Sequence, residues 1–238
     1  GDPALTLSEA WLDPAERERF GRLRSPLGQR CFAEGRRLAR QMLANLADCA
    51  PASLSCVIDE EGKPCFAELP DWHFNISHSG TLVACACARS PVGLDIEWHK
   101  PGRNRLEIAD RFFTPAEVAA IRETSADNLV RFYHYWTLKE AWLKWHGIGL
   151  SGLSTVPEYQ FAAGGQLLRM DGRPSDGKLA VWDLIQVDNG PDPDNRTPGK
   201  AANNWSIALA ADRSWELEWH PRFGLPDGLS LNPISETV

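Results

Sequence analysis

Apolar residues recur at helical spacing in two long stretches of this chain, residues 26–47 and residues 129–146. Such spacing predicts a helix with one apolar face, because residues three or four positions apart lie on the same side of a helix. In the first stretch, Arg30, Arg37 and Arg40 fall largely on the opposite, polar side. We therefore expect two amphipathic helices, each packed on a core through its apolar side. The apolar side of the first consists of Leu27, Cys31, Leu38, Met42, Leu43 and Leu46.

Short apolar runs bounded by glycine, proline and serine follow each of these helices, and they predict strands. A third helix is predicted from Thr114 toward Glu123, because Thr114 and Glu117 have capping-box spacing and Pro115 occupies the first helical position. The strand-like runs lie at residues 54–58, 72–76, 82–88, 92–98, 159–161, 166–170, 179–185, 205–210 and 215–219.

The order of these elements predicts the fold class. Helices followed by strands occur twice, which indicates an α+β fold of two similar subdomains. We place the N-terminal subdomain at residues 1–98 and the C-terminal subdomain at residues 99–238. Residues 188–204 and the tail after Pro221 are predicted to be exposed loops, since turn-forming residues are frequent there.

Three carboxylates stand out against this pattern. Glu140 lies on the apolar stripe of its helix, four positions after Trp136, where an unpaired charge would be costly. It therefore needs a partner, which is either a lysine or a metal ion. Asp95 and Glu97 share one face of a predicted strand, where they either face solvent or face a cleft in which a divalent cation relieves their repulsion. Oxygen ligands alone favour Mg²⁺ or Mn²⁺ over zinc.

Composition narrows the class of protein. With 238 residues, 43% of them hydrophobic, and ten tryptophans, the chain can form a substantial core. A net charge of -7 disfavours nonspecific nucleic-acid binding as the main role. No apolar run approaches the roughly 18 residues of a membrane span, and no secretion signal is recognised, so we expect a cytoplasmic protein without a membrane segment.

Arginines and cysteines add two further expectations. Eight arginines against three glutamates between Pro14 and Arg40 form either a basic patch for a phosphate-rich ligand or acidic partner, or the solvated face of a helix. The six cysteines include no C-x-x-C pair, so we expect reduced, mostly buried thiols. Cys85 and Cys87 should lie side by side on one face of a strand.

Four blocks of sequence, taken together, resemble a known family. Their order is that of the 4'-phosphopantetheinyl transferases, and the chain is similar to the long, surfactin-synthetase-activating type over residues 62–144. The blocks are Gly62-Lys63-Pro64, Phe74-Asn75-Ile76-Ser77-His78-Ser79, Val92-Gly93-Leu94-Asp95-Ile96-Glu97 and Trp136-Thr137-Leu138-Lys139-Glu140-Ala141-Trp142-Leu143-Lys144.

The resemblance implies a monomer of two pseudo-symmetric halves that binds coenzyme A and Mg²⁺ at their junction. The implied reaction transfers the 4'-phosphopantetheine arm of coenzyme A to a serine of an apo acyl or peptidyl carrier protein and releases 3',5'-ADP. Such carriers serve fatty-acid, polyketide and nonribosomal peptide biosynthesis. Two alternatives remain open: a Mg²⁺-dependent nucleotide pyrophosphate hydrolase, and a module that binds coenzyme A or a carrier protein without transfer.

The resemblance also implies roles for residues of the reaction centre. Asp95, Glu97 and Glu140 would be metal ligands, Glu97 either directly or through water. Either Glu140 or a metal-bound water would take the serine proton. Lys144 would contact the pyrophosphate, and the alternative for it is an ordinary ion pair with Glu140 one helical turn away.

A second group is implied on the adenosine side of coenzyme A. Lys63, Ser77 and His78 would hold the 3'-phosphate and its surroundings. Lys139 would either hold a phosphate or extend to solvent. Three further residues are candidates: Arg17 and Arg30 for coenzyme A contacts, and Glu117, for which helix capping is the favoured role.

Overall fold

The computed structural model describes residues 10–100, 104–123, 128–161, 166–169, 178–186, 204–211 and 229–237. These residues form an α+β fold, as expected. Five α-helices are described: α2 (Pro14–Arg22), α3 (Pro26–Ala47), α4 (Arg105–Phe112), α5 (Pro115–Glu123) and α6 (Asn128–Trp145), with short 3-10 turns η1 (Pro51–Ser53) and η2 (Leu150–Thr155). The helices predicted at 26–47, 114–123 and 129–146 are thereby confirmed.

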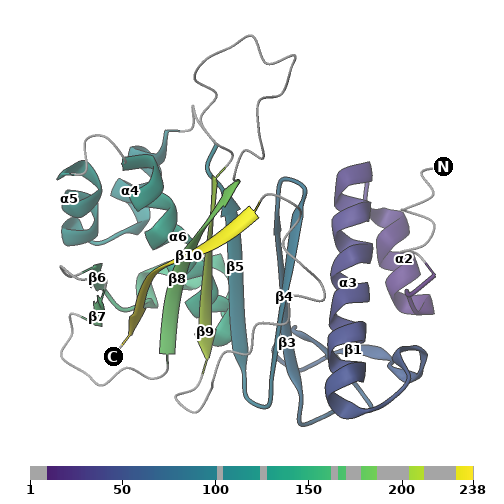
Figure 1. The fold of residues 1–238 in the computed structure, drawn as a ribbon. Coiled ribbons are helices and arrows are strands. Elements are labelled where there is room, and N and C mark those ends of the chain that lie inside the picture. The colour runs from purple at the N-terminus through teal and green to yellow at the C-terminus, as the bar shows by residue number, and fades with distance from the viewer. Residues whose placement is uncertain are drawn as a thin grey trace.

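The strands form one large and two small sheets within the described part of the chain. The large sheet has the order β5-β9-β8-β10-β7-β6, while β1 pairs with β2 and β3 with β4 as antiparallel ribbons. In Figure 1 the β3–β4 ribbon lies between α3 and the large sheet. The strands are β1 (Cys56–Ile58), β2 (Pro64–Phe66), β3 (His73–Ser79), β4 (Leu82–Ala88), β5 (Val92–Trp98), β6 (Tyr159–Phe161), β7 (Gln166–Arg169), β8 (Lys178–Gln186), β9 (Asn204–Ala211) and β10 (Leu229–Thr237).

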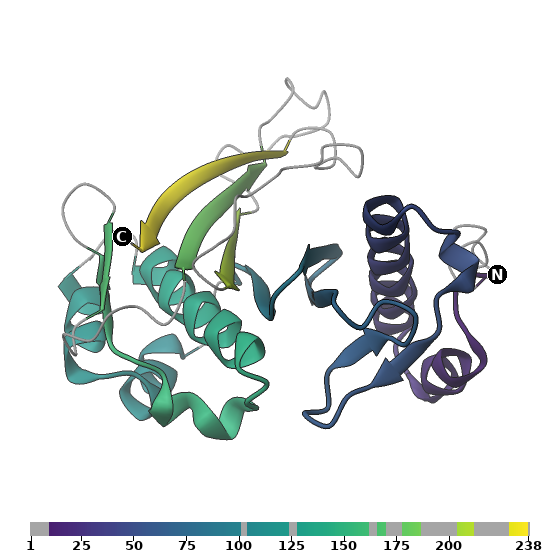
Figure 2. The same ribbon diagram turned by 90° about the horizontal axis from the view of Figure 1, so that it is seen from below.

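Two groups of elements flank the ribbon. Figure 2 shows α2, α3, β1 and β2 on one side, and α6 with the large sheet on the other. Apolar side chains of α3 pack on Phe66 and Phe74 in one core, while α6 packs on β9 through Leu138, Ala141 and Ala208 in another. The ribbon therefore lies beside β5, the strand of the first hundred residues that joins the large sheet by pairing with β9.

The tail corrects one prediction. Residues 229–237 are not an exposed loop but strand β10, which pairs antiparallel with β8 and parallel with β7. The register shifts between Pro233 and Ser235, a position where a residue without a backbone N–H is tolerated. The predicted strand at 215–219 and the loop predicted at 188–204, apart from Asn204 in β9, lie outside the described residues.

The cysteines are free thiols, as predicted, and the Sγ atoms of Cys85 and Cys87 lie 3.9 Å apart on β4. The expectation that the thiols are mostly buried is wrong, because only Cys31 is fully buried. Among the described residues, no helix combines the length and the apolarity that crossing a membrane requires.

Arg40 of α3 departs from the predicted polar face. Arg30 is exposed, but Arg40 retains only 2% of its side-chain surface and Arg36 is also buried. Arg40 Nη2 lies 3.1 Å from Asp13 Oδ2 and 2.7 Å from Glu16 Oε2. At the ends of the predicted apolar side, Leu27 and Leu46 are exposed instead.

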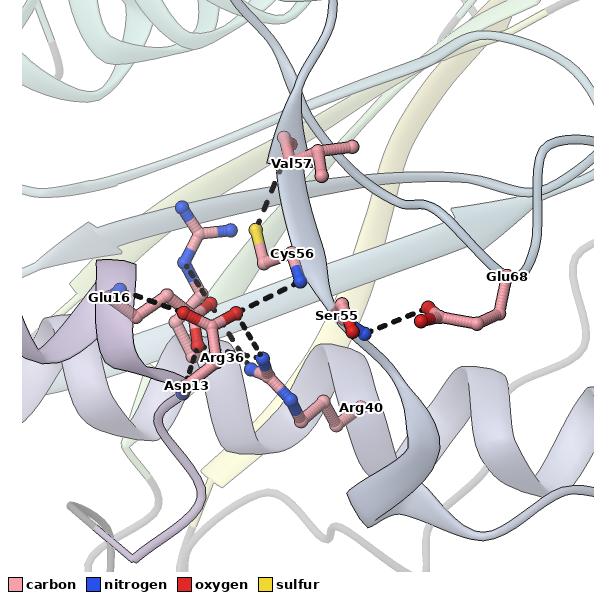
Figure 3. Close-up of polar contacts among 8 residues, drawn as sticks. All are labelled: Asp13, Glu16, Arg36, Arg40, Ser55, Cys56, Val57 and Glu68. Atoms are coloured by element: carbon pink, nitrogen blue, oxygen red, sulfur yellow. Dashed lines mark hydrogen bonds and ion pairs between the residues drawn. The ribbon is translucent and has the colours of Figure 1, made fainter.

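These charges connect three elements, as Figure 3 shows. Asp13 caps α2, pairs with Arg40 of α3 and accepts a hydrogen bond of 2.9 Å from the backbone N–H of Cys56 in β1. Arg36 Nε lies 3.3 Å from Glu16 Oε1. Arg36 and Arg40 therefore anchor α2 through Asp13 and Glu16. These two arginines form neither a basic patch for a ligand nor the solvated face of a helix.

This buried cluster predicts a strong stability effect. Arg40→Met should lower the free energy of unfolding by about 3–5 kcal/mol, because Asp13 loses its cation and Glu16 keeps only Arg36 as a partner. Arg37→Met is the matched control: its partner Glu34 is on the same helix and its side chain is 27% exposed, so about 1 kcal/mol or less is expected. Urea denaturation measures both, and equal losses would contradict the assignment.

Candidate active site

A glycine allows β5 to lie directly against α6. A Cβ added to Gly93 would stand 2.0 Å from the carbonyl oxygen of Ala141 and 2.3 Å from the backbone nitrogen of Trp145. Only glycine permits that approach, because both obstacles are backbone atoms. The approach brings the strand that carries Asp95 and Glu97 beside the helix that carries Glu140.

Asp95 and Ser77, both buried, and the partly exposed Lys144 form a contact between β5, β3 and α6. Lys144 Nζ lies 2.6 Å from Asp95 Oδ1 and 3.1 Å from Ser77 Oγ. Ser77 Oγ donates to Asp95 Oδ1 at 2.9 Å and accepts from the N–H of Ile96 at 3.3 Å. Among the described residues, the ion pair of Lys144 is thus with Asp95 rather than with Glu140.

Glu97 has a similar partner on β3. Ser79 Oγ donates to Glu97 Oε2 at 2.8 Å and accepts a hydrogen bond of 2.9 Å from the N–H of Trp98. Burial raises the pKa of Glu97, and the neighbouring charge of Asp95 raises it further. Sequence reasoning did not assign Ser79, although its alternation with Ser77 on one face of β3 was a usable signal.

Glu140 is half-buried within reach of the same charges. Burial raises the pKa of Glu140 to about 7, with further increases from Asp95 and Glu97 and an opposing effect from Lys144. Burial also raises the pKa of Asp95, against the lowering effects of Lys144 and Ser77. The three predicted metal ligands therefore share one electrostatic environment.

The donor chemistry of this environment suits a hard cation. Asp95 Oδ2 is buried, and no hydrogen-bond partner for it exists among the described residues. Within those residues, no group of three or more His, Cys, Asp or Glu side chains is arranged so that it could hold a metal ion by itself. A site using one or two carboxylates would need oxygen ligands from water or substrate, which is usual for Mg²⁺.

Lys63 lies at the end of α6. Its Nζ donates to the carbonyl oxygen of Trp145 at 2.7 Å, and burial lowers the pKa of Lys63. The helix ends in a Schellman motif, in which Gly147 has φ +68° and Ile148 N–H donates to the carbonyl of Leu143. Lys63 thus places a cation at the negative end of the helix dipole.

His78, Arg17 and Arg30 lie at the surface. His78 is exposed, yet partial desolvation and the positive charge of Lys144 lower its pKa. Arg17 on α2 and Arg30 on α3 are exposed as well. The structure brings His78 near the site through Lys144, while the roles of the two arginines stay predictions.

Lys139 corrects a prediction. It neither extends to solvent nor lies open to a phosphate: it forms an ion pair of 2.9 Å with Glu117, and the two side chains retain 1% and 0% of their surface. The capping role of Glu117 is confirmed, because Glu117 Oε2 accepts from Thr114 N–H and Thr114 Oγ1 accepts from Glu117 N–H. The pair fixes α6 against the start of α5.

Comparisons with known proteins agree with these motifs. The family model described as the 4'-phosphopantetheinyl transferase superfamily matches residues 91–210. The chain is 43% identical over 118 residues to a 4'-phosphopantetheinyl transferase of Bacillus subtilis, covering 49% of this chain and 52% of the relative. It is 37% identical over 143 residues to 4'-phosphopantetheinyl transferase Sfp of Bacillus subtilis strain 168, covering 60% and 63%.

A third relative extends the comparison beyond Bacillus. The chain is 34% identical over 161 residues to 4'-phosphopantetheinyl transferase HetI of Nostoc, covering 65% of each chain. The chain thus spans from about half to just under two thirds of the length of these curated relatives.

Because the pKa of Glu140 is raised, we expect that replacing Glu140 by an uncharged residue stabilises the folded protein at high pH but not at low pH. Since the folded state binds this proton more tightly than the unfolded state, ionisation of Glu140 costs stability as pH rises from about 4.5 through about 7. In EDTA, Glu140→Gln should be more stable than the unchanged protein at pH 8 by on the order of 2 kcal/mol, with no gain at pH 4.5.

Urea denaturation at the two pH values measures this difference. Glu107→Gln, at an exposed position of α4, is the control for the loss of one carboxylate. A gain for Glu140→Gln that is the same at both pH values, or matched by the control, would contradict the raised pKa.

Proposed function

The chain belongs to the 4'-phosphopantetheinyl transferase superfamily, and from this we propose that it transfers the 4'-phosphopantetheine arm of coenzyme A to a serine of an apo acyl or peptidyl carrier protein. The observation that carries the proposal is the convergence of Asp95, Glu97, Glu140 and Lys144 at the contact of β5 with α6, inside the matched segment. The relatives named above bear the name of this activity.

We propose that Asp95, Glu97 and Glu140 hold Mg²⁺ or Mn²⁺ together with oxygen atoms of water and substrate, Glu97 either directly or through water. The support is chemical: the donors are all carboxylates, Asp95 raises the pKa of both Glu97 and Glu140, and Asp95 Oδ2 is buried without a hydrogen-bond partner among the described residues. The coenzyme A pyrophosphate would supply the remaining oxygen ligands. Such a cation would supply positive charge that offsets the negative charge of the pyrophosphate.

In the proposed reaction, groups of the site would accept the serine proton and neutralise charge on the pyrophosphate. The serine oxygen of the carrier bonds to the phosphorus that bears pantetheine, the bond from that phosphorus to the bridging oxygen breaks, and 3',5'-ADP leaves with the electron pair. Either Glu140 or a water molecule at the cation would accept the serine proton. Lys144, held at the site by Asp95, would contact the pyrophosphate.

We propose that the 3'-phosphate side of coenzyme A lies toward Lys63 and His78, with Arg17 and Arg30 as further candidates. Ser77 would contribute to this region mainly by holding Asp95 and Lys144 in place rather than by contacting coenzyme A. Its hydroxyl already donates one hydrogen bond and accepts two, which is its full capacity.

We also propose that residues 1–98 and 99–238 are the two pseudo-symmetric halves and that the site lies at their junction. Supporting this, β5 pairs with β9 on one edge and receives side chains of β3 on the other. We further propose that the protein acts as a monomer, as the resemblance to the long type of the family implies.

The reaction predicts a mass increase on the carrier. Incubation with coenzyme A, Mg²⁺ and a panel of apo carrier proteins should add one phosphopantetheine per carrier and release 3',5'-ADP, both measured by mass spectrometry. Glu140→Gln should lower kcat at least about 100-fold, as expected for loss of a proton acceptor or metal ligand. Glu107→Gln is again the control.

Other outcomes would replace this function. Release of 3',5'-ADP without carrier modification would indicate a pyrophosphate hydrolase. If neither product forms although coenzyme A binds, the chain is a binding module. Near-normal turnover of Glu140→Gln would contradict the assignment of Glu140.

The position of Lys63 predicts discrimination between two forms of coenzyme A. Lys63→Ala should raise KM for coenzyme A about tenfold or more, since a charge-assisted contact to the 3'-phosphate is lost, but should change KM for 3'-dephospho coenzyme A much less. Any effect through the Trp145 carbonyl acts on both substrates and cancels in the ratio. Glu61→Ala, in the same turn, is the control; an equal rise with both substrates would move Lys63 away from the 3'-phosphate.

A further inference from the structure

The edge of β5 that faces away from β9 is bonded by side chains rather than by a backbone ladder. Three alternating residues of β3, Asn75, Ser77 and Ser79, each accept a hydrogen bond from a backbone N–H of β5. These side-chain oxygens take the place of the carbonyl groups of a neighbouring strand. The bonds run from Leu94 N–H to Asn75 Oδ1 at 2.9 Å, from Ile96 N–H to Ser77 Oγ at 3.3 Å and from Trp98 N–H to Ser79 Oγ at 2.9 Å.

Two of these three side chains have a second task. The hydroxyls of Ser77 and Ser79 donate to Asp95 Oδ1 and Glu97 Oε2, at 2.9 Å and 2.8 Å. Asn75, in the same row, has no such bond to a carboxylate among the contacts of the described residues. Asn75 therefore only joins β3 to β5, whereas Ser77 and Ser79 join the strands and also bind a carboxylate.

The hydroxyl of Ser79 is suited to fix the direction of its bond. Because its oxygen accepts the N–H of Trp98, its hydrogen is turned toward Glu97. The residue is 6% exposed, so little water competes for either bond. Glu97 is attached to the same strand as Trp98, and both bonds set the carboxylate relative to the backbone of β5.

We infer that Ser79 is a positioning residue for Glu97, and that it prepares this carboxylate for the divalent cation of the reaction proposed above. The inference rests on the proposed function. Ser77 holds Asp95 in a parallel way, but its contact with Lys144 gives it more than one task. Ser79 is the cleaner test, since both of its bonds serve one carboxylate and its strand.

The expected size of the effect follows from the way in which outer-shell partners act. Loss of a hydrogen bond that orients a metal ligand typically weakens metal binding 10–100-fold. Ser79→Ala should therefore weaken Mn²⁺ binding at least about tenfold, while Ser79→Thr, which keeps the hydroxyl, should remain within about threefold of the unchanged protein. Asn75→Ala removes one bond of the same row without touching a carboxylate, so it should lower Tm with little change in Mn²⁺ affinity.

The experiment measures free Mn²⁺ by electron paramagnetic resonance, in titrations of the full chain with and without coenzyme A. Tm is measured for each variant. Ser79→Ala is also made in a Glu97→Gln background, where it should cause no further loss of affinity, because the carboxylate on which it acts is gone. If the alanine variant does not fold, Ser79→Cys, with its weak donor, replaces it and should show the same loss.

The possible results distinguish a failure of the role inferred for Ser79 from a failure of the proposed transferase function. If the unchanged protein binds Mn²⁺ and modifies carrier proteins, but Ser79→Ala or Ser79→Cys behaves like Asn75→Ala, the inference alone fails. An equal loss in the Glu97→Gln background also overturns it, since the effect would not pass through Glu97. If the unchanged protein neither binds Mn²⁺ nor transfers, the proposed function fails and the inference fails with it.

Discussion

The close approach of β5 to α6 at Gly93 is the constraint on which the site depends. Two backbones meet there without an intervening side chain, which places the carboxylates of the strand against the last turns of the helix. This approach lets Lys144 on the helix form an ion pair with Asp95 on the strand. Ser77 on β3 donates a hydrogen bond to the same carboxylate. A methyl group at position 93 would have to displace backbone atoms of α6, so the spacing is determined by the absence of one carbon atom.

That spacing concentrates negative charge at a cost to stability. Burial raises the pKa of Asp95, Glu97 and Glu140, and the positive charge of Lys144 opposes only part of this increase. Elsewhere in the molecule, buried charges are balanced closely, as in the pair of Lys139 with Glu117. The contrast is typical of functional sites, where charges are arranged for a ligand rather than for the folded chain alone.

Sequence patterns predicted regular elements well where one periodicity dominates. The bounds of β4, β5 and β6 match the predicted runs, and α3 and α6 begin and end within one residue of expectation. Arg40 was misplaced because a periodicity of apolar residues cannot show that carboxylates from α2 will bury an arginine. β10 was missed because its proline and polar residues resemble a loop until its two neighbours are known.

The same limit applies to the candidate site. The sequence motifs indicated which residues gather, but a motif does not show which oxygen meets which donor. The bond of Lys63 to Trp145 joins residues 82 positions apart, and Ser79 meets Glu97 across 18. Such partners arise from tertiary packing, and only the alternation along β3 hinted at one of them.

The order of strands in the large sheet has a consequence for biosynthesis. β10 lies between β8 and β7, yet it follows all the other strands of the sheet in the chain. During translation β5, β9 and β8 can pair as soon as β9 has left the ribosome, whereas the β6–β7 ribbon must wait for β10 before it joins them. Until then the outer edge of β8 has no strand partner from this sheet, and an unpaired edge is where a nascent chain is most open to chaperones or to a neighbouring copy.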